Sequence, residues 1–183
     1  NRGHSFTKAE GFLLKGLLGM LGLDFIENYN GKIKNVKKFN SLGYPLDMAL
    51  TSGCDENEWL YQAQFLISKI TGEVIENAFG QLPEELQGDD VEHLKLSLKE
   101  RLNNLDKIAS KYYKELQKTP SIAASDLNDT FKINYTSSGV HIQIYKGNKE
   151  VPFFDHNFNK KKTQEIWLYG LGGDDSFVIE GEA

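Results

Sequence analysis

The stretch "DTFKINYTSSGVHIQIYKG", residues 129–147, decides the fold class of the second half of this chain. On either side of a central Thr-Ser-Ser-Gly turn, every second residue is apolar: Phe131, Ile133 and Tyr135, then Val140, Ile142 and Ile144. A period of two is typical of strands that bury one face, and a short turn between two such runs predicts a β-hairpin. Further apolar runs lie within residues 150–158, 165–171 and 176–181. We therefore predict a small antiparallel β-domain of about five strands over residues 120–183.

The first part of the chain, residues 1–119, has helical periodicity instead. From Asp89 to about Lys118, apolar residues recur every three or four positions and form one face: Leu94, Leu98, Leu102, Leu105, Ile108, Ala109, Tyr112 and Leu116. This spacing predicts one long amphipathic helix. Thr71 is expected to cap a shorter helix, and residues 28–46, rich in Asn, Gly and Lys, are interpreted as a long loop. The chain is thus expected to be α+β, with a helical subdomain followed by the β-domain.

Composition restricts the class of protein. The chain has 183 residues, of which 39% are apolar and 26% charged, as in a globular domain. The net charge of −5 argues against a nucleic-acid partner, because such proteins concentrate positive charge. The longest apolar stretch, residues 11–23, is interrupted by Lys15 and is shorter than the ~20 residues that cross a bilayer, so we expect no membrane insertion. Because the sequence begins at Asn1, we interpret it as a piece of a larger protein.

Two acidic turns share a sequence pattern. "DLNDTFKI", residues 126–133, aligns with "GGDDSFVI", residues 172–179. In each, a polar turn leads to a small hydroxyl residue and then to apolar residues at alternate positions. The alignment pairs the polar residues of the two turns: Asn128 with Asp174, and Asp129 with Asp175. We infer that two strands enter the sheet through similar turns.

Calcium is the sharpest metal hypothesis for these turns. Closely spaced Asp and Asn side chains, together with backbone carbonyls, supply the oxygen ligands that a hard cation needs. The segment "LYGLGGDDSF" also has the form of one copy of a calcium-binding nonapeptide repeat. Two such turns side by side could share one ion through Asn128, Asp129, Asp174 and Asp175. The alternative is an ordinary turn in which a glycine adopts a positive φ.

The sequence lacks the residues that a phosphate-binding loop, a histidine metal site or an acid–base catalytic site would require. The glycines of "GLGG" precede a strand pattern and lack the Lys-Ser/Thr pair of a P-loop. The four histidines show no metal-ligand spacing. Asp155 beside His156 is a conceivable acid–base pair, but no candidate nucleophile lies nearby in sequence, so we interpret the two as part of a loop between strands. No catalytic residue and no cofactor other than calcium is therefore assigned.

Four segments together resemble one region of a family of large Gram-negative envelope proteins: "GEVIENAFGQLPEEL", "LKERLNNLDKIASKYYKELQK", "SDLNDTFKI" and "EIWLYGLGGDDSFVIEGE". The members of this family are calcineurin-like metallophosphoesterases with a C-terminal outer-membrane barrel of the surface-antigen type. The resemblance covers nearly the whole chain and places it between the phosphoesterase domain and the barrel. It implies a location in the cell envelope, on the periplasmic side of the outer membrane. The sequence contains neither phosphoesterase motifs nor barrel strands, so neither activity is assigned to it.

The N-terminal segment departs from this family. Where the family typically reads Asp-Arg-Asp-Gln-Ala-Phe, faintly similar to an acidic motif of kinase-like spore-coat proteins, this chain reads "NRGHSF". Asn1 and Gly3 stand at the two aspartate positions, and neither supplies a carboxylate for magnesium. The residues left for phosphate binding in this segment are Arg2, His4 and Lys8.

The sequence thus favours a non-catalytic connecting or interaction module of a larger envelope protein, whose partners are the neighbouring domains of its parent chain. Two alternatives stay open at this point. One is a remnant of a kinase-like or phosphate-handling domain, and the other is a structural domain stabilised by calcium.

Overall fold

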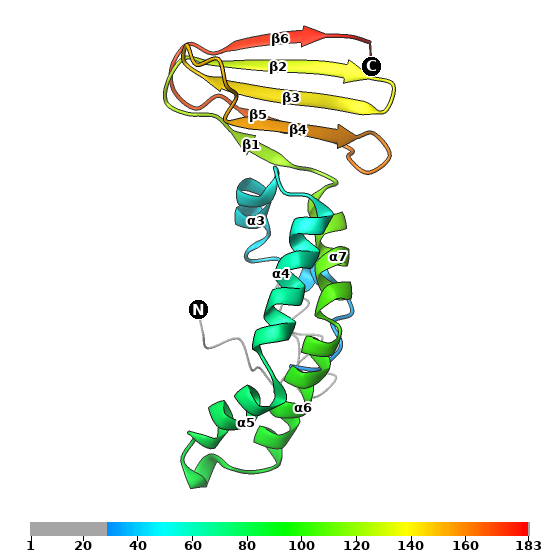
Figure 1. Cartoon of the computed structure of the whole chain (residues 1–183), viewed down its shortest axis with the longest axis vertical. Coiled ribbons are helices and arrows are strands. Elements are labelled where there is room, and N and C mark those ends of the chain that lie inside the picture. The colour runs from blue at the N-terminus through cyan, green and yellow to red at the C-terminus, as the bar shows by residue number, and fades with distance from the viewer. Residues whose placement is uncertain (1–28, 183) are drawn as a thin grey trace, which may run out of the picture. The chain divides into compact units, whose positions relative to one another are not determined.

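The computed structural model describes residues 29–182, which form two compact units (Figure 1). One unit consists of residues 29–42 and 56–112 and is helical. The other consists of residues 43–55 and 113–182 and contains all of the described strands. The α+β class predicted from the sequence is confirmed. The expected division at residue 119 differs from this grouping, because the second unit also includes residues 43–55 and 113–119.

Helices form the first unit: α2 (Val36–Phe39), α4 (Glu56–Lys69), α5 (Gly72–Gly80), the 3-10 helix η2 (Glu84–Leu86), α6 (Asp89–Asn103) and most of α7 (Leu105–Leu116). As predicted, Thr71 caps α5, because its hydroxyl accepts a hydrogen bond from the N–H of Val74 at 3.3 Å. The prediction of a long loop over residues 28–46 is wrong for Val36–Phe39, which form α2, and from Tyr44 on, where the next helix begins. The Asn35 side chain accepts a hydrogen bond from the N–H of Lys38 and so starts α2.

The predicted long helix occurs as two consecutive helices, α6 and α7, separated at Asn104. The N–H of Asn104 donates to the carbonyl oxygen of Arg101 at 3.1 Å, whereas its side-chain amide donates to that of Glu100 at 2.9 Å. The side chain therefore takes the acceptor that a helical N–H would use, which is one reason why asparagine is a poor helix former. Neither helix, nor any other within residues 29–182, is long and apolar enough to cross a membrane.

The second unit contains α3 (Tyr44–Thr51) and two sheets. The larger sheet has the strand order β4-β3-β2-β6, and the smaller one pairs β1 with β5; the strands are β1 (Ser121–Ala123), β2 (Asp129–Thr136), β3 (Gly139–Lys146), β4 (Phe154–Asn159), β5 (Trp167–Tyr169) and β6 (Ser176–Glu180). The predicted hairpin joins β2 to β3, and β3 also pairs antiparallel with β4. In contrast, β2–β6 and β1–β5 are parallel pairs. The alternation of apolar and polar residues does not predict these parallel pairs, because it is the same for strands that run in either direction.

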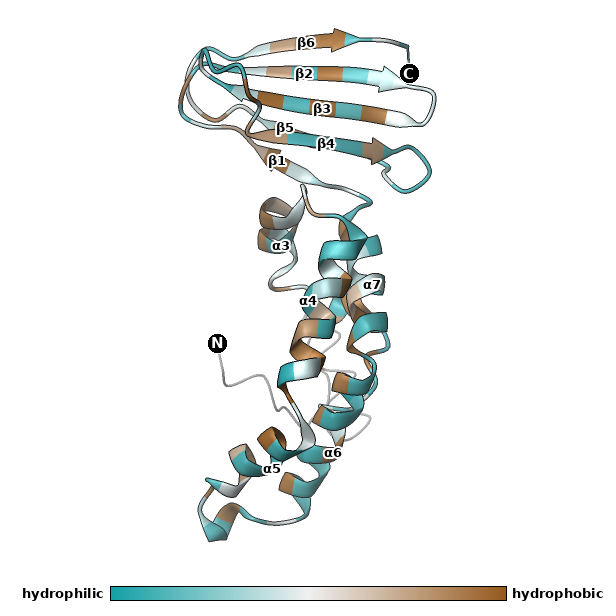
Figure 2. Ribbon diagram, viewed as in Figure 1, coloured by the Kyte–Doolittle hydropathy of each residue, from teal (hydrophilic) through white to brown (hydrophobic). Residues whose placement is uncertain are grey.

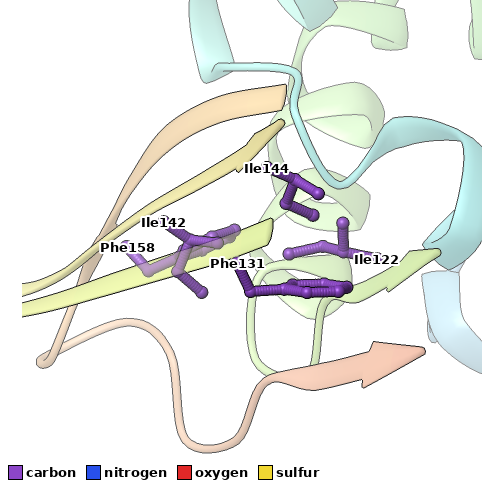
Figure 3. Packing of buried hydrophobic residues seen from close by; sticks show 5 residues of the cluster. All are labelled: Ile122, Phe131, Ile142, Ile144 and Phe158. Atoms are coloured by element: carbon purple, nitrogen blue, oxygen red, sulfur yellow. The ribbon is translucent and has the colours of Figure 1, made fainter. Parts of the chain in front are cut away.

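The hydrophobic core of this unit lies on one face of the larger sheet (Figure 3). Its buried members are Ile122, Phe131, Ile142, Ile144 and Phe158. Three of them belong to the alternating pattern from which the hairpin was predicted, and Figure 2 shows that alternation along β2 and β3. Full burial of a side chain such as that of Phe131 contributes roughly 1.5–3 kcal/mol, so this face anchors the sheet and the turns at its edge.

Candidate functional site

The structure brings together the four residues predicted to form an acidic site. Asn128 precedes β2 and Asp129 is its first residue, whereas Asp174 and Asp175 precede β6. The two turns meet because these strands pair side by side in parallel. The N–H of Asp129 donates to Oδ1 of Asp175 at 2.8 Å. In return, the N–H of Asp174 donates to Oδ1 of Asn128 at 3.0 Å. Each turn thus provides a side-chain acceptor for a backbone N–H of the other.

Asp129 is the buried centre of this arrangement, with 1% of its surface exposed. Its Oδ2 accepts hydrogen bonds from the N–H and the hydroxyl of Ser125, both at 2.7 Å, and its Oδ1 accepts one from the N–H of Gly147 at 3.3 Å. Burial alone would raise the pKa of Asp129, but these hydrogen bonds and the charge of Lys146 outweigh it and lower the pKa. The carboxylate is therefore held ionised by the chain segments around it.

Glycines allow the second turn to lie against the first. Gly173 has a φ of 86°, and a Cβ on it would lie 2.5 Å from the carbonyl carbon and oxygen of Leu127. A Cβ on Gly170 would collide with Oδ2 of Asp175. A positive φ at a glycine is what the turn interpretation predicted, and Gly173 confirms it. The glycines allow this close approach of the two backbones.

The side-chain oxygens of the turns are largely committed to these contacts. Asn128, Asp129 and Asp175 each accept a backbone hydrogen bond, which leaves the exposed carboxylate of Asp174 as the acidic group of the set that no described hydrogen bond engages. Within residues 29–182, no group of three or more His, Cys, Asp and Glu side chains is placed to hold a metal ion. The arrangement acts as a cross-link between two turns.

The stacking extends well beyond the acidic residues. β1 pairs with β5 and β2 pairs with β6, and both pairings join residues 46 apart, such as Ile122 with Leu168 and Phe131 with Phe177. In the turn between the strands, Gly173 lies against Leu127 with the same spacing. Two strand–turn–strand segments are thus stacked in one register, which we name repeat A (residues 121–135) and repeat B (residues 167–181). The sequence alignment found only their second halves, because β1 and β5 have no residues in common.

A polar network covers the other face of the larger sheet. Nε2 of His141 lies 2.7 Å from Oδ1 of Asp155, and the side-chain amide of Gln143 donates to Oδ2 at 2.7 Å. These hydrogen bonds from His141 and Gln143 lower the pKa of Asp155 against the effect of its partial burial. The Tyr145 hydroxyl donates to Gln143 at 3.2 Å, and Nζ of Lys132 lies 4.7 Å from the centre of the Tyr145 ring. The network links three neighbouring strands, and sequence reasoning missed it because it depends on strand register.

The prediction that Asp155 and His156 belong to a loop is wrong, since both lie in β4. Consecutive strand residues point to opposite faces, so these two side chains are separated. The His156 ring lies with its centre 4.7 Å from that of Phe158, on the core side, whereas Asp155 contacts His141 across the other face. The adjacent residues therefore do not form an acid–base pair with each other.

A groove of about 340 Å³ opens beside the core of the second unit. Apolar and polar residues both line it; the apolar ones include Ile133, Val140, Ile142, Phe158, Ile166 and Leu168, and the polar ones include Lys160, Thr163, Gln164 and Glu165. Small-molecule sites usually combine this size with a few polar groups that converge inside. None of the predicted site residues lines the groove.

Arg2, His4 and Lys8, the residues considered for phosphate binding, lie outside the described residues. No protein-family model matches the chain, and it matches no curated protein and no solved structure. The resemblance to envelope metallophosphoesterases therefore stays a prediction.

Proposed function

We propose that this chain is a non-catalytic connecting or interaction module of a larger bacterial cell-envelope protein. The observation that carries the proposal is the use made of the predicted acidic site. The side chains of Asn128 and Asp175 each accept a backbone N–H of the opposite turn, and that of Asp129 accepts the N–H of Ser125, so all three stabilise the sheet edge. A catalytic or ion-binding site would need such oxygens to be available to a substrate or an ion.

The other charged clusters among the described residues support the same role. Lys95 lies 2.9 Å from a carboxylate oxygen of Glu76 and 2.7 Å from one of Glu92, which ties α6 to α5. The hydrogen bonds from Lys99 and Lys95 lower the pKa of Glu76. Asp155 is likewise engaged through both of its oxygens. These groups are paired with one another in ways that fix helices and strands.

The place of the module in a cell rests on the sequence resemblance. That resemblance, carried by "QLPEEL" and "LYGLGGDD", supports a position between a phosphoesterase domain and an outer-membrane barrel, on the periplasmic side. Neighbouring domains of the parent chain are the partners that follow from such a position. Fractionation of cells that make the parent protein is expected to recover this segment with the outer membrane, and recovery in the cytosol would contradict the location.

A turnover assay tests the absence of catalysis. The purified chain is incubated with p-nitrophenyl phosphate, bis-p-nitrophenyl phosphate or ATP in the presence of Mg²⁺, Mn²⁺ or Ca²⁺. We expect no release of nitrophenol or phosphate above the buffer rate. The matched variant is Asp155→Asn, which removes the charge of the described carboxylate that contacts a histidine. A rate that copurifies with the chain and is lost in this variant would overturn the proposal.

A further inference from the structure

Repeat B stands at an open edge of both sheets. β6 is the last strand of the larger sheet, beyond β2, and β5 is the last strand of the smaller one, beyond β1 (Figure 1). Among residues 29–182, no strand pairs with the far side of either. The edge therefore presents unpaired backbone groups from two strands at once, and such edges readily accept a further strand.

The side chains of repeat B are exposed where those of repeat A are covered. Phe131 is fully buried, and its ring stacks on that of Phe177 with centres 4.4 Å apart and planes 11° from parallel. Phe177, at the same position of repeat B, is 51% exposed. Ile133 is 9% exposed, but its counterpart Ile179 is 63% exposed. Repeat B thus leaves uncovered the same apolar positions that it covers on repeat A.

The acidic turn repeats the same asymmetry. Repeat A gives the N–H of Asp129 to a carboxylate of repeat B, and its Asn128 accepts an N–H from repeat B. Asp175 and Asp174 occupy these two positions in repeat B. A third segment in the same register would find a donor in the N–H of Asp175 and an acceptor in the side chain of Asp174. Equivalent backbone groups of stacked parallel strands point in the same direction.

We propose that the outer edge of β5 and β6 is a docking site for a third strand–turn–strand segment, supplied by a partner polypeptide. This proposal rests on the proposed role as an interaction module. The partner segment carries two glycines, an Asn or Asp, an Asp, a Ser or Thr, and then an aromatic and an aliphatic residue at alternate positions. It pairs in parallel with both strands, stacks its aromatic ring on Phe177 and covers Ile179.

The requirements on this segment follow from repeat B itself. Glycines are needed in its turn, because a Cβ on Gly173 would collide with the backbone of repeat A at Leu127. The Asp is needed to accept the N–H of Asp175, as Asp175 accepts that of Asp129. A second copy of this chain does not supply such a segment at a free edge, since its β2 is already flanked by β3 and β6 and its edge strand β4 does not follow a Gly-Gly-Asp-Asp turn.

The test uses the chain and a fluorescein-labelled peptide with the sequence of residues 165–182. Fluorescence anisotropy is expected to show saturable binding. Hydrogen exchange is expected to slow at the amides of β5 and β6 when the peptide is bound and to stay unchanged in β3. A peptide with alanine in place of the Asp that corresponds to Asp175 should bind at least about tenfold more weakly, because it leaves a backbone donor unpaired.

Matched variants of the chain locate the site. Ile179→Arg should weaken peptide binding at least about tenfold without a change in melting temperature, since Ile179 is exposed and its apolar contact would be lost. Leu96→Arg, an exposed leucine of α6, is the control and should bind the peptide normally. The proposal is overturned by absence of binding, by faster exchange in β6 as the peptide replaces it, or by self-association of the chain at this edge. None of these results changes the outcome of the turnover assay, which tests the module proposal separately.

Discussion

Asp129 and Asp175 have equivalent positions in two stacked turns, but their side chains make different contacts. Asp129 is buried and uses both carboxylate oxygens to hold Ser125 and Gly147, whereas Asp175 is half-buried and uses Oδ1 to hold the N–H of Asp129. An amide can replace a carboxylate that needs one accepting oxygen. It cannot replace one whose two oxygens both face N–H groups, because one of its ends is itself a donor.

We therefore expect Asp129→Asn to lower the free energy of unfolding by roughly 2–3 kcal/mol, through a buried donor left unpaired. Asp175→Asn should change it by less than about 1 kcal/mol, since the Oδ1 acceptor is retained. Urea denaturation of the two variants beside the parent chain measures both values. Equal losses in the two variants would show that the carboxylates do the same work.

Gly173 gives a second prediction at this scale. Gly173→Ala combines a positive φ with a Cβ 2.5 Å from the Leu127 backbone, and we expect it to cost roughly 2–5 kcal/mol. Gly147→Ala is the matched control, because its φ of 55° is also positive but a Cβ there meets no atom within 4 Å. It should cost about 1–2 kcal/mol, the conformational term alone. Thermal unfolding of both variants measures the difference, and a Gly173→Ala variant as stable as Gly147→Ala would contradict the close contact.

Sequence patterns identified the acidic residues but not their partners. The eight-residue alignment brought Asn128 and Asp129 together with Asp174 and Asp175, and the structure places all four side by side. Gly147 and Ser125 could not be found in this way. Gly147 lies in the turn after β3, and Ser125 lies in the loop before β2. Their contacts with Asp129 depend on how these segments fold, which residue spacing does not predict.

At the scale of elements, local patterns predicted strands and helices better than their connections. The period of two predicted β2 and β3 and their hairpin, because the residues that face the core there are apolar. The parallel pairs escaped prediction, although the offset between the two acidic turns equals their register of 46 residues. β1 is too short for any periodicity, and the single residue Asn104 divides a helical pattern that otherwise runs on.

Acid stability is the prediction that belongs to the elements. Asp129 ties the loop before β2 to the turn after β3, and Asp155 ties β4 to β3. Hydrogen bonding lowers the pKa of both carboxyl groups in the folded chain. A group of this kind stabilises the fold above its unfolded pKa, and the contribution is lost as pH falls through the lower folded value.

The urea midpoint should therefore be insensitive to these two groups above about pH 5 and should decrease as the pH is lowered below about 4, the ordinary range for Asp. Asp155→Asn, which removes one of the groups, should make the decrease shallower. A midpoint that rises on acidification through this range would contradict the assignment, and a slope unchanged in Asp155→Asn would remove Asp155 from it.

At the scale of the whole molecule, the chain consists of a helical unit and a unit of two sheets, and the latter contains the stacked repeats. We infer that the acidic turns hold this second unit together through hydrogen bonds rather than through an ion. Composition and spacing could not decide between these interpretations, since Asn and Asp oxygens serve both. The positions of the N–H donors favour hydrogen bonding. These positions depend on the pairing of strands that lie far apart in sequence.

The most direct measurement is the melting temperature of the chain in EDTA and in excess Ca²⁺, followed by circular dichroism. We expect the same melting temperature in both, because side-chain oxygens of Asn128, Asp129 and Asp175 already accept backbone N–H groups. An ion present at 100 times its dissociation constant would instead raise it by roughly 5–10 °C. A rise of this size that disappears in Asp174→Asn would contradict the account and make the paired turns a calcium site.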